Sequence, residues 1–228
     1  QARPKELTMD GRLSLYALLI ALVAFGCAED EAPQPGSLKL AWSPGPQVDC
    51  ATAELATIEV ELRSGERSVL RQSFACDEQS AFLDALSPGR YTLSLRGYDA
   101  SQTATFEGAL DSVRVVEGEV IDAGTVRLAA LPAQVDLVWR FDNGYLCAQN
   151  GVERIVVRVY DAEYYDIGSL EFACEEGAGA LMPLAAGRYW VELSALGPDG
   201  LPALNAVLDL DLRRGELRPV DVVFAETR

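Results

Sequence analysis

Cysteine is the residue type whose spacing says most about chemistry in this sequence. Cys50 and Cys76 are separated by nearly the same stretch as Cys147 and Cys174, and Cys27 stands alone near the amino terminus. No C-x-x-C pair occurs, so the spacing does not indicate a thiol redox centre or a zinc site. Separations of this length instead suit disulfides formed in an oxidising compartment, which leaves Cys27 for a different role.

The sequence contains no histidine. This removes the commonest general base and a common metal ligand, and with them every His-dependent triad and every H-E-x-x-H zinc site. Gly-rich phosphate loops and G-x-S-x-G or S-x-x-K motifs do not occur either. A glycoside hydrolase, which needs only two carboxylates about 5 to 10 Å apart, stays open as the less favoured alternative. We expect no enzyme activity, no catalytic residue and no cofactor.

Acidic residues greatly outnumber basic ones, with 35 Asp and Glu against 19 Lys and Arg. Such an excess argues against nucleic acid as a partner. Three groups of oxygen-bearing side chains could hold calcium, but the same patterns are typical of turns and alternating surface strands, and we expect no metal site. The groups are Asp142-Asn143-Gly144; Asp161, Glu163 and Asp166; and Asp209 and Asp211.

Aromatic residues concentrate in the second half of the chain, at Tyr145, Tyr160, Tyr164, Tyr165 and Trp190. Exposed aromatic rings stack on sugars or anchor protein partners. We predict a candidate binding surface made of Tyr145, Tyr164, Tyr165 and Trp190, with Tyr164 and Tyr165 near the tip of a hairpin. Clustering on one exposed face would favour a carbohydrate-binding module, whereas burial or scattering would indicate ordinary packing.

Residues 13–25 form an uncharged apolar run, LSLYALLIALVAF, that follows Arg12. The run is shorter than the roughly 20 residues that span a bilayer, but it has the length of the apolar region of a signal peptide. We therefore expect residues 1–26 to be a secretion signal, with Met9 as a candidate true start.

The segment Val23-Ala24-Phe25-Gly26-Cys27 resembles a bacterial lipobox, the motif that directs diacylglycerol onto a cysteine that becomes the first mature residue. Small Gly26 matches the motif, whereas Phe25 stands where a small residue is usual. The resemblance implies that Cys27 is lipidated and anchors the protein to a membrane, with residues 27–36 as an acidic tether. An ordinary signal peptide with a bystander cysteine, or an uncleaved anchor, remains open.

The rest of the chain is one module written twice, in residues 37–130 and 131–228. SLKLAW (37–42) corresponds to QVDLVW (134–139), and TIEVEL (57–62) corresponds to RIVVRV (154–159). Phe-Ala-Cys, Gly-Arg-Tyr and Gly-Glu then follow in the same order in both copies. The duplication pairs the cysteines within each copy, Cys50 with Cys76 and Cys147 with Cys174.

Apolar residues alternate with polar ones along several segments of each copy, which is typical of half-buried strands. Gly and Pro interrupt these runs at short intervals, which gives about seven strands per copy and favours a sandwich of two sheets. We therefore predict an all-β protein with two tandem antiparallel β-sandwich domains. The residues predicted to be buried include Leu38, Leu40, Trp42, Ile58, Val60, Leu62, Tyr91, Leu93 and Leu95, and their counterparts Val135, Leu137, Trp139, Ile155, Val157, Val159, Tyr189, Val191 and Leu193.

The stretches LSPGRYTLSLRGYD and LAAGRYWVELSALGPDG resemble the turn-and-strand motif of transthyretin-like and carboxypeptidase-regulatory-like β-sandwiches, and of related immunoglobulin-like modules on bacterial surfaces. The resemblance implies spacers, binding domains or adhesive units without catalytic groups. The resulting hypothesis is an envelope lipoprotein that serves as an adhesive, scaffolding or ligand-binding element, with an envelope protein or a glycan as its partner. Ala28 stands where an aspartate retains some lipoproteins at the inner membrane, so the outer membrane is favoured. The sequence does not indicate an oligomeric state.

Overall fold

The computed structural model describes residues 33–225. Within this range the chain is all-β. Its only helical segments are three short 3-10 turns, η1 (Cys76–Glu78), η2 (Cys147–Asn150) and η3 (Cys174–Glu176). In residues 33–225 no helix is long and apolar enough to cross a membrane. The predicted signal peptide, Cys27 and most of the predicted tether lie outside the described residues.

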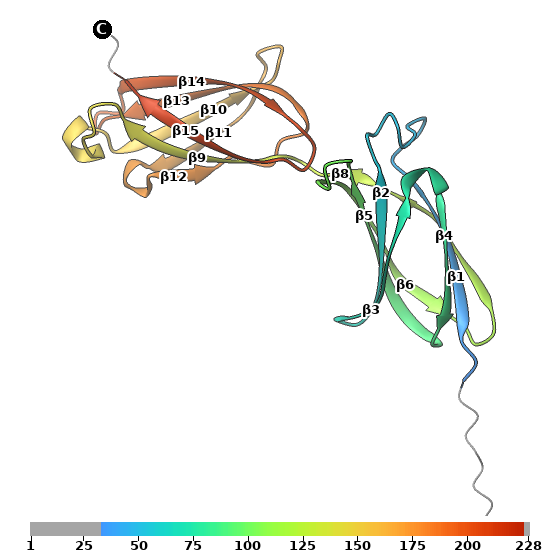
Figure 1. The fold of residues 1–228 in the computed structure, drawn as a ribbon. Helices are drawn as coiled ribbons and strands as arrows, with labels where there is room; N and C mark the ends of the chain where they lie inside the picture. The colour runs from blue at the N-terminus through green and yellow to red at the C-terminus, as the bar shows by residue number, and fades with distance from the viewer. Residues whose placement is uncertain (1–32, 226–228) are drawn as a thin grey trace, which may run out of the picture. The chain divides into compact units, whose positions relative to one another are not determined.

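The first repeat folds into two layers of strands (Figure 1). Its strands are β1 (Gly36–Ser43), β2 (Thr57–Ser64), β3 (Arg67–Ala75), β4 (Ser80–Leu86), β5 (Gly89–Tyr98), β6 (Ala104–Val115), β7 (Val120–Arg127) and β8 (Ala129–Ala130). The larger sheet has the strand order β3-β2-β5-β6-β8, and the smaller sheet has the order β4-β1-β7.

The second repeat is built in the same way (Figure 1). Its strands are β9 (Gln134–Phe141), β10 (Arg154–Tyr160), β11 (Asp166–Ala173), β12 (Ala178–Ala180), β13 (Gly187–Leu196), β14 (Pro202–Leu212) and β15 (Leu217–Phe224). The larger sheet has the order β11-β10-β13-β14 and the smaller has the order β12-β9-β15. Each sheet takes its strands from one repeat only, and each repeat is a β-sandwich of two sheets.

One strand pair in each repeat is parallel. β1 runs parallel to β7, and β9 runs parallel to β15, while every other pair among the described strands is antiparallel. Parallel neighbours need a long crossover connection, and the five strands between the first and the last provide it. The predicted all-β fold with two sandwiches is confirmed, with this parallel pair added to an otherwise antiparallel arrangement. The domain limits 37–130 and 131–228 stay a prediction.

The two hydrophobic cores are separate, and each is made from one repeat. All the residues that the alternation assigned to a buried face are buried, none with more than 8% of its surface exposed. Along β1 and β9, buried residues alternate with exposed or partly exposed ones. The period-two pattern therefore fixed which face of each strand lies inside.

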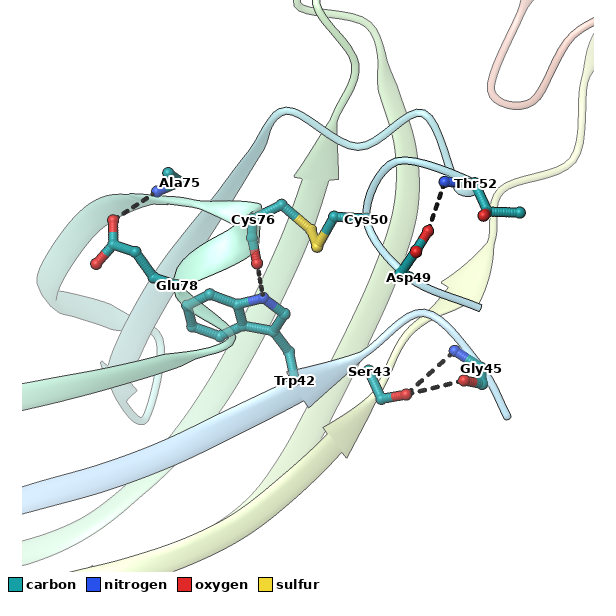
Figure 2. Close-up of a disulfide and its surroundings, with 9 residues drawn as sticks. All are labelled: Trp42, Ser43, Gly45, Asp49, Cys50, Thr52, Ala75, Cys76 and Glu78. Carbon is teal, nitrogen blue, oxygen red and sulfur yellow. Dashed lines mark hydrogen bonds between the residues drawn. A yellow bond between two sulfur atoms is a disulfide. The ribbon is translucent and has the colours of Figure 1, made fainter. Parts of the chain in front are cut away.

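Each core is tied to its disulfide by a tryptophan. Both predicted disulfides are present, Cys50–Cys76 and Cys147–Cys174. Figure 2 shows the indole of Trp42 pointing at Cys76, whose carbonyl oxygen accepts a hydrogen bond from the indole Nε1 at 3.0 Å. Because the indole is buried, this bond satisfies a donor that would otherwise be costly to remove from water.

The Gly-Arg-Tyr motif forms the turn into the fifth strand of each repeat. The hydroxyl of Tyr91 donates a hydrogen bond to the carbonyl oxygen of Ser87 at 2.6 Å, and that of Tyr189 donates to Ala185 at 3.0 Å. Each ring is thereby buried while its hydroxyl keeps a partner. The Gly-Arg-Tyr motif, on which the sequence resemblance rests, therefore stabilises this turn through the tyrosine hydroxyl.

Candidate functional site

The hairpin between β10 and β11 holds Tyr164 in a fixed position. The carboxylate of Asp161 accepts hydrogen bonds from the backbone N–H groups of Glu163 and Tyr165 at 3.0 and 2.9 Å. The backbone N–H of Tyr164 donates to the carbonyl oxygen of Asp161 at 3.1 Å. Asp161 therefore closes the loop on both sides of Tyr164, which is typical of aspartate at the start of a turn.

The backbone of Tyr164 lies in the left-handed region, with φ of 66°. An aromatic side chain rarely adopts this conformation, which normally costs on the order of 1 kcal/mol or more. The corresponding hairpin of the first repeat, between β2 and β3, is shorter and uses Gly65 at φ of 59°. The second repeat thus places a large ring where the first has no side chain.

Tyr164, Tyr160 and Trp190 form a stacked group that we name the aromatic cluster. Tyr160 and Trp190 are cross-strand neighbours on β10 and β13, on the face opposite the buried residues Val159 and Val191. The ring of Tyr164 packs on both, with centroids 5.6 Å from Tyr160 and 5.6 Å from Trp190 and interplanar angles of 31° and 28°. Offset stacking at this distance is favourable for aromatic rings.

An ion pair borders the aromatic cluster. The guanidinium carbon of Arg188 lies 5.1 Å from the centroid of the Trp190 ring, and the same guanidinium donates two hydrogen bonds to the carboxylate of Asp209 at 2.9 and 2.5 Å. These hydrogen bonds lower the pKa of Asp209, and they raise the pKa of Arg188. The bidentate geometry fixes the guanidinium beside the indole, where it makes a cation–π contact.

The predicted binding surface is divided by the structure. Tyr164 and Trp190 come together, and Tyr164 remains 55% exposed. Tyr165 lies in the same loop with 71% of its surface exposed, but it is not part of the stack. Tyr145 lies before β10 begins and lines a different cavity of about 630 Å³ beside the disulfide, with Trp139 among the other lining residues.

Tyr160 and Arg188 complete the site without having been predicted as part of it. The signal for Tyr160 was its place on the polar side of an alternating strand, two positions after Arg158. Arg188 belongs to the Gly-Arg-Tyr motif and lies two positions before Trp190, so both side chains share one face of β13. The sequence signal for both residues was therefore their spacing of two positions from another residue on the same face of a strand.

Three of the residues that could have been calcium ligands, Asp161, Asp209 and Asn143, have other partners. Asp161 closes the hairpin, Asp209 pairs with Arg188, and the side chain of Asn143 accepts from Tyr145 and donates to Asn150. In the described part of the chain, no group of three or more His, Cys, Asp or Glu residues is arranged to hold a metal ion. The turn interpretation of these residues fits their hydrogen bonds.

The same face of the first repeat has a different chemistry. Its larger sheet carries Arg63 and Thr92 at the cross-strand positions of Tyr160 and Trp190. The outer face of the same sheet also carries a charged hollow of about 580 Å³. Arg71 reaches Glu61 at 3.1 Å and Glu59 at 3.9 Å, and the hollow is further lined by Ser94, Arg96, Tyr98, Glu107, Ala109 and Arg127, among others. The two repeats therefore have corresponding core residues, but they differ on the outer face of the larger sheet.

No protein-family model matches the sequence, and no curated protein matches it. Among solved structures, the Bacillus anthracis TIE protein is similar over 85% of this chain with 15% identity and a TM-score of 0.36, and the chain spans 34% of the length of that protein. The fimbrial anchor protein Mfa2 from Porphyromonas gingivalis is similar over 78% of this chain and 83% of its own, with 12% identity and a TM-score of 0.35. GBS52, the minor pilin of Streptococcus agalactiae, is similar over 85% and 97%, with 13% identity and a TM-score of 0.32. At such identities the likeness concerns no more than the fold.

Proposed function

We propose that this chain is a non-enzymatic, lipid-anchored element of the bacterial envelope that displays two β-sandwich modules for adhesion, scaffolding or ligand binding. The observation that carries the proposal is the contrast between the two repeats. Their disulfides and Trp–Cys hydrogen bonds correspond, and their strand orders are the same apart from the two-residue β8 of the first repeat, while the outer faces of their larger sheets differ. A common frame with variable outer faces is what a display module requires.

The charges of the carboxyl groups support a non-enzymatic role. A glycoside hydrolase needs one carboxyl group whose pKa is raised so that it can donate a proton near neutral pH. Among residues 33–225, the carboxyl groups whose pKa clearly departs from the ordinary value are all shifted downward, and hydrogen bonds are the main lowering cause: Asp49, Glu61, Asp84, Asp99 and Asp209. Such groups stay ionised and act as acceptors in turns and ion pairs.

The strand order supports the transthyretin-like part of the sequence resemblance. In immunoglobulin constant domains the first strand pairs with the second. Here β1 pairs with β4 and β7, and β2 pairs with β3 and β5. We therefore favour tandem transthyretin-like modules, which are carried outside the inner membrane by the lipid on Cys27.

The anchor is tested by intact mass of the protein purified from membranes, for the natural sequence and for Cys27→Ser. A mass that begins at Cys27 and includes acyl groups, together with loss of membrane association in Cys27→Ser, is expected. Alkylation before and after reduction gives the matched control, because the four other cysteines should react only after reduction. A protein that keeps residues 13–25, or carries no lipid, would overturn the proposed anchor.

Display is tested separately by fractionating the two membranes and treating intact cells with a protease. Enrichment in the outer membrane is expected, and the protease arm shows which side of that membrane carries the modules. Recovery of the wild-type protein in the soluble cytoplasm would contradict the proposal.

A further inference from the structure

We propose that the aromatic cluster, formed by Tyr160, Tyr164 and Trp190, is a binding site for neutral carbohydrate. This inference rests on the proposed display function and adds a site and a ligand class to it.

The cluster offers an aromatic surface to a ligand from solvent. The Tyr164 ring stacks on Trp190 and packs at a tilt against Tyr160, and 55% of the residue is still exposed. The C–H faces of a pyranose ring carry partial positive charge, and the face of an aromatic ring is its negative side. A sugar ring that stacks on the outer face of Tyr164 therefore gains both dispersion and electrostatic attraction.

The border of the cluster matches the hydroxyl groups of a sugar. Arg188 provides N–H donors and Asp209 provides carboxylate acceptors, and both side chains remain about half exposed while they pair with each other. Glu192 lies two positions after Trp190 on the same face of β13, and Arg158 is its cross-strand partner on β10. Hydroxyl groups both donate and accept, so a mixed border of this kind can satisfy them.

Charge favours a neutral ligand over an acidic one. The hairpin loop and the strand that follows it carry Asp161, Glu163 and Asp166, in addition to Glu192 and Asp209 on the neighbouring strands. Arg154, Arg158 and Arg188 are the basic residues on the same face of β10 and β13, and Arg154 is paired with Glu171. An anionic sugar would meet net repulsion here. An apolar protein partner is also less suitable, because the centre of a protein interface is usually depleted of charged side chains.

The backbone of Tyr164 points to the same site. A non-glycine residue at positive φ has a strained backbone that contacts with the surrounding structure must stabilise. Such strained residues are enriched at functional sites. The first repeat forms its corresponding turn with Gly65 and without that cost. In the second repeat the left-handed backbone of Tyr164 costs free energy, and this conformation places the Tyr164 ring against Tyr160 and Trp190 in an exposed hairpin.

The test is titration of the purified full chain with neutral oligosaccharides, namely hexasaccharides of glucose, mannose, xylose and N-acetylglucosamine, with oligogalacturonate as the acidic comparison. Calorimetry measures affinity, and tryptophan fluorescence measures occupancy of the site. Of the three tryptophans, Trp42 and Trp139 are buried and Trp190 is not, so a change on binding reports Trp190. Saturable binding of a neutral oligosaccharide with a fluorescence change is expected.

Tyr164→Gly removes the ring while it keeps a residue suited to the left-handed turn, and it should weaken binding about tenfold or more. Tyr165→Ala, in the same loop but outside the stack, is the matched control and should bind as the natural chain does. Trp190→Phe, measured by calorimetry, gives a second variant that removes the indole without altering the turn, and it should also weaken binding.

The inference is overturned if no neutral oligosaccharide binds, if only oligogalacturonate binds, or if Tyr164→Gly and Trp190→Phe bind with unchanged affinity. These outcomes are independent of the membrane experiments. If the natural protein carries no lipid but binds a sugar, the carbohydrate site is supported and the proposed anchor is overturned. If it is lipidated but binds no sugar, the anchor is supported and the carbohydrate site is overturned.

Discussion

The indole Nε1 of Trp139 donates a hydrogen bond to the carbonyl oxygen of Cys174 at 2.9 Å. Trp139 belongs to the smaller sheet, and Cys174 lies where the chain leaves β11 of the larger sheet for β12 of the smaller one. The bond therefore fixes the crossing between the two layers. In the first repeat the indole Nε1 of Trp42 donates the corresponding hydrogen bond to the carbonyl oxygen of Cys76.

Replacing Trp139 with Phe should destabilise the second sandwich by about 2 to 4 kcal/mol. The change removes buried ring atoms and one of the two hydrogen bonds that the carbonyl oxygen of Cys174 accepts, the other of which comes from the backbone N–H of Gly177. Urea unfolding followed by circular dichroism measures the effect, with Trp190→Phe as the matched control at a partly exposed position. Equal stability of the two variants would show that the hydrogen bond and its packing contribute little.

Removing one disulfide should destabilise its own sandwich by about 3 to 4 kcal/mol through loss of loop closure in the unfolded chain. The sequence separations of 26 and 27 are nearly equal, so Cys50→Ser/Cys76→Ser and Cys147→Ser/Cys174→Ser should have similar effects. Each double variant serves as the control for the other. Denaturant unfolding monitored by hydrogen exchange assigns the loss to a repeat, and a loss spread equally over both repeats would contradict independent cores.

The sequence could predict the two sandwiches and their disulfides because the patterns that indicate them are local and occur in both repeats. Alternation of apolar residues identified the buried positions, including Trp42 and Trp139, and duplication identified the disulfide partners. The parallel pairing of β1 with β7 could not be obtained in this way, because a period of two reports which side of a strand is buried and not which strand lies beside it.

The candidate site was predicted only in part for a different reason. Tyr164 and Trp190 are far apart in sequence, and they meet because β10 pairs with β13 in one register. The left-handed backbone of Tyr164 depends on the hydrogen bonds of Asp161, which no propensity for tyrosine would suggest. Tyr145 was grouped with them by composition, and its place beside the other end of β10 separates it from the stack.

The ion pair of Asp209 with Arg188 should make stability depend on pH. Hydrogen bonds from Arg188 lower the pKa of Asp209 in the folded state below the ordinary value of 3.8. A depressed folded-state pKa contributes stability that is present above the unfolded-state value and is lost as pH falls through the folded-state value. Asp209→Asn should therefore be less stable than the natural chain at pH 7, and the difference should vanish at about pH 2.

Urea unfolding at both values of pH measures the effect, and carboxyl resonances followed by NMR give the titration of Asp209 directly. Asp136→Asn, which removes a charge from the exposed side of β9, is the control for net charge. If the stability difference between Asp209→Asn and the natural chain were the same at both values of pH, the ion pair would not be its source.

The conformation of Tyr164 predicts an order of stability among its variants. Tyr164→Ala loses the stacked ring but keeps a Cβ atom at positive φ, so the backbone cost remains. Tyr164→Gly loses the same ring but also releases that cost, so it should be more stable than Tyr164→Ala by about 1 kcal/mol. Gly65→Ala in the first repeat is the converse control and should lose about the same amount, because a Cβ atom there meets open space and only the conformation opposes it. Urea unfolding of the three variants measures the order, and equal stability of Tyr164→Ala and Tyr164→Gly would mean that the hairpin relaxes out of the left-handed conformation once the ring is gone.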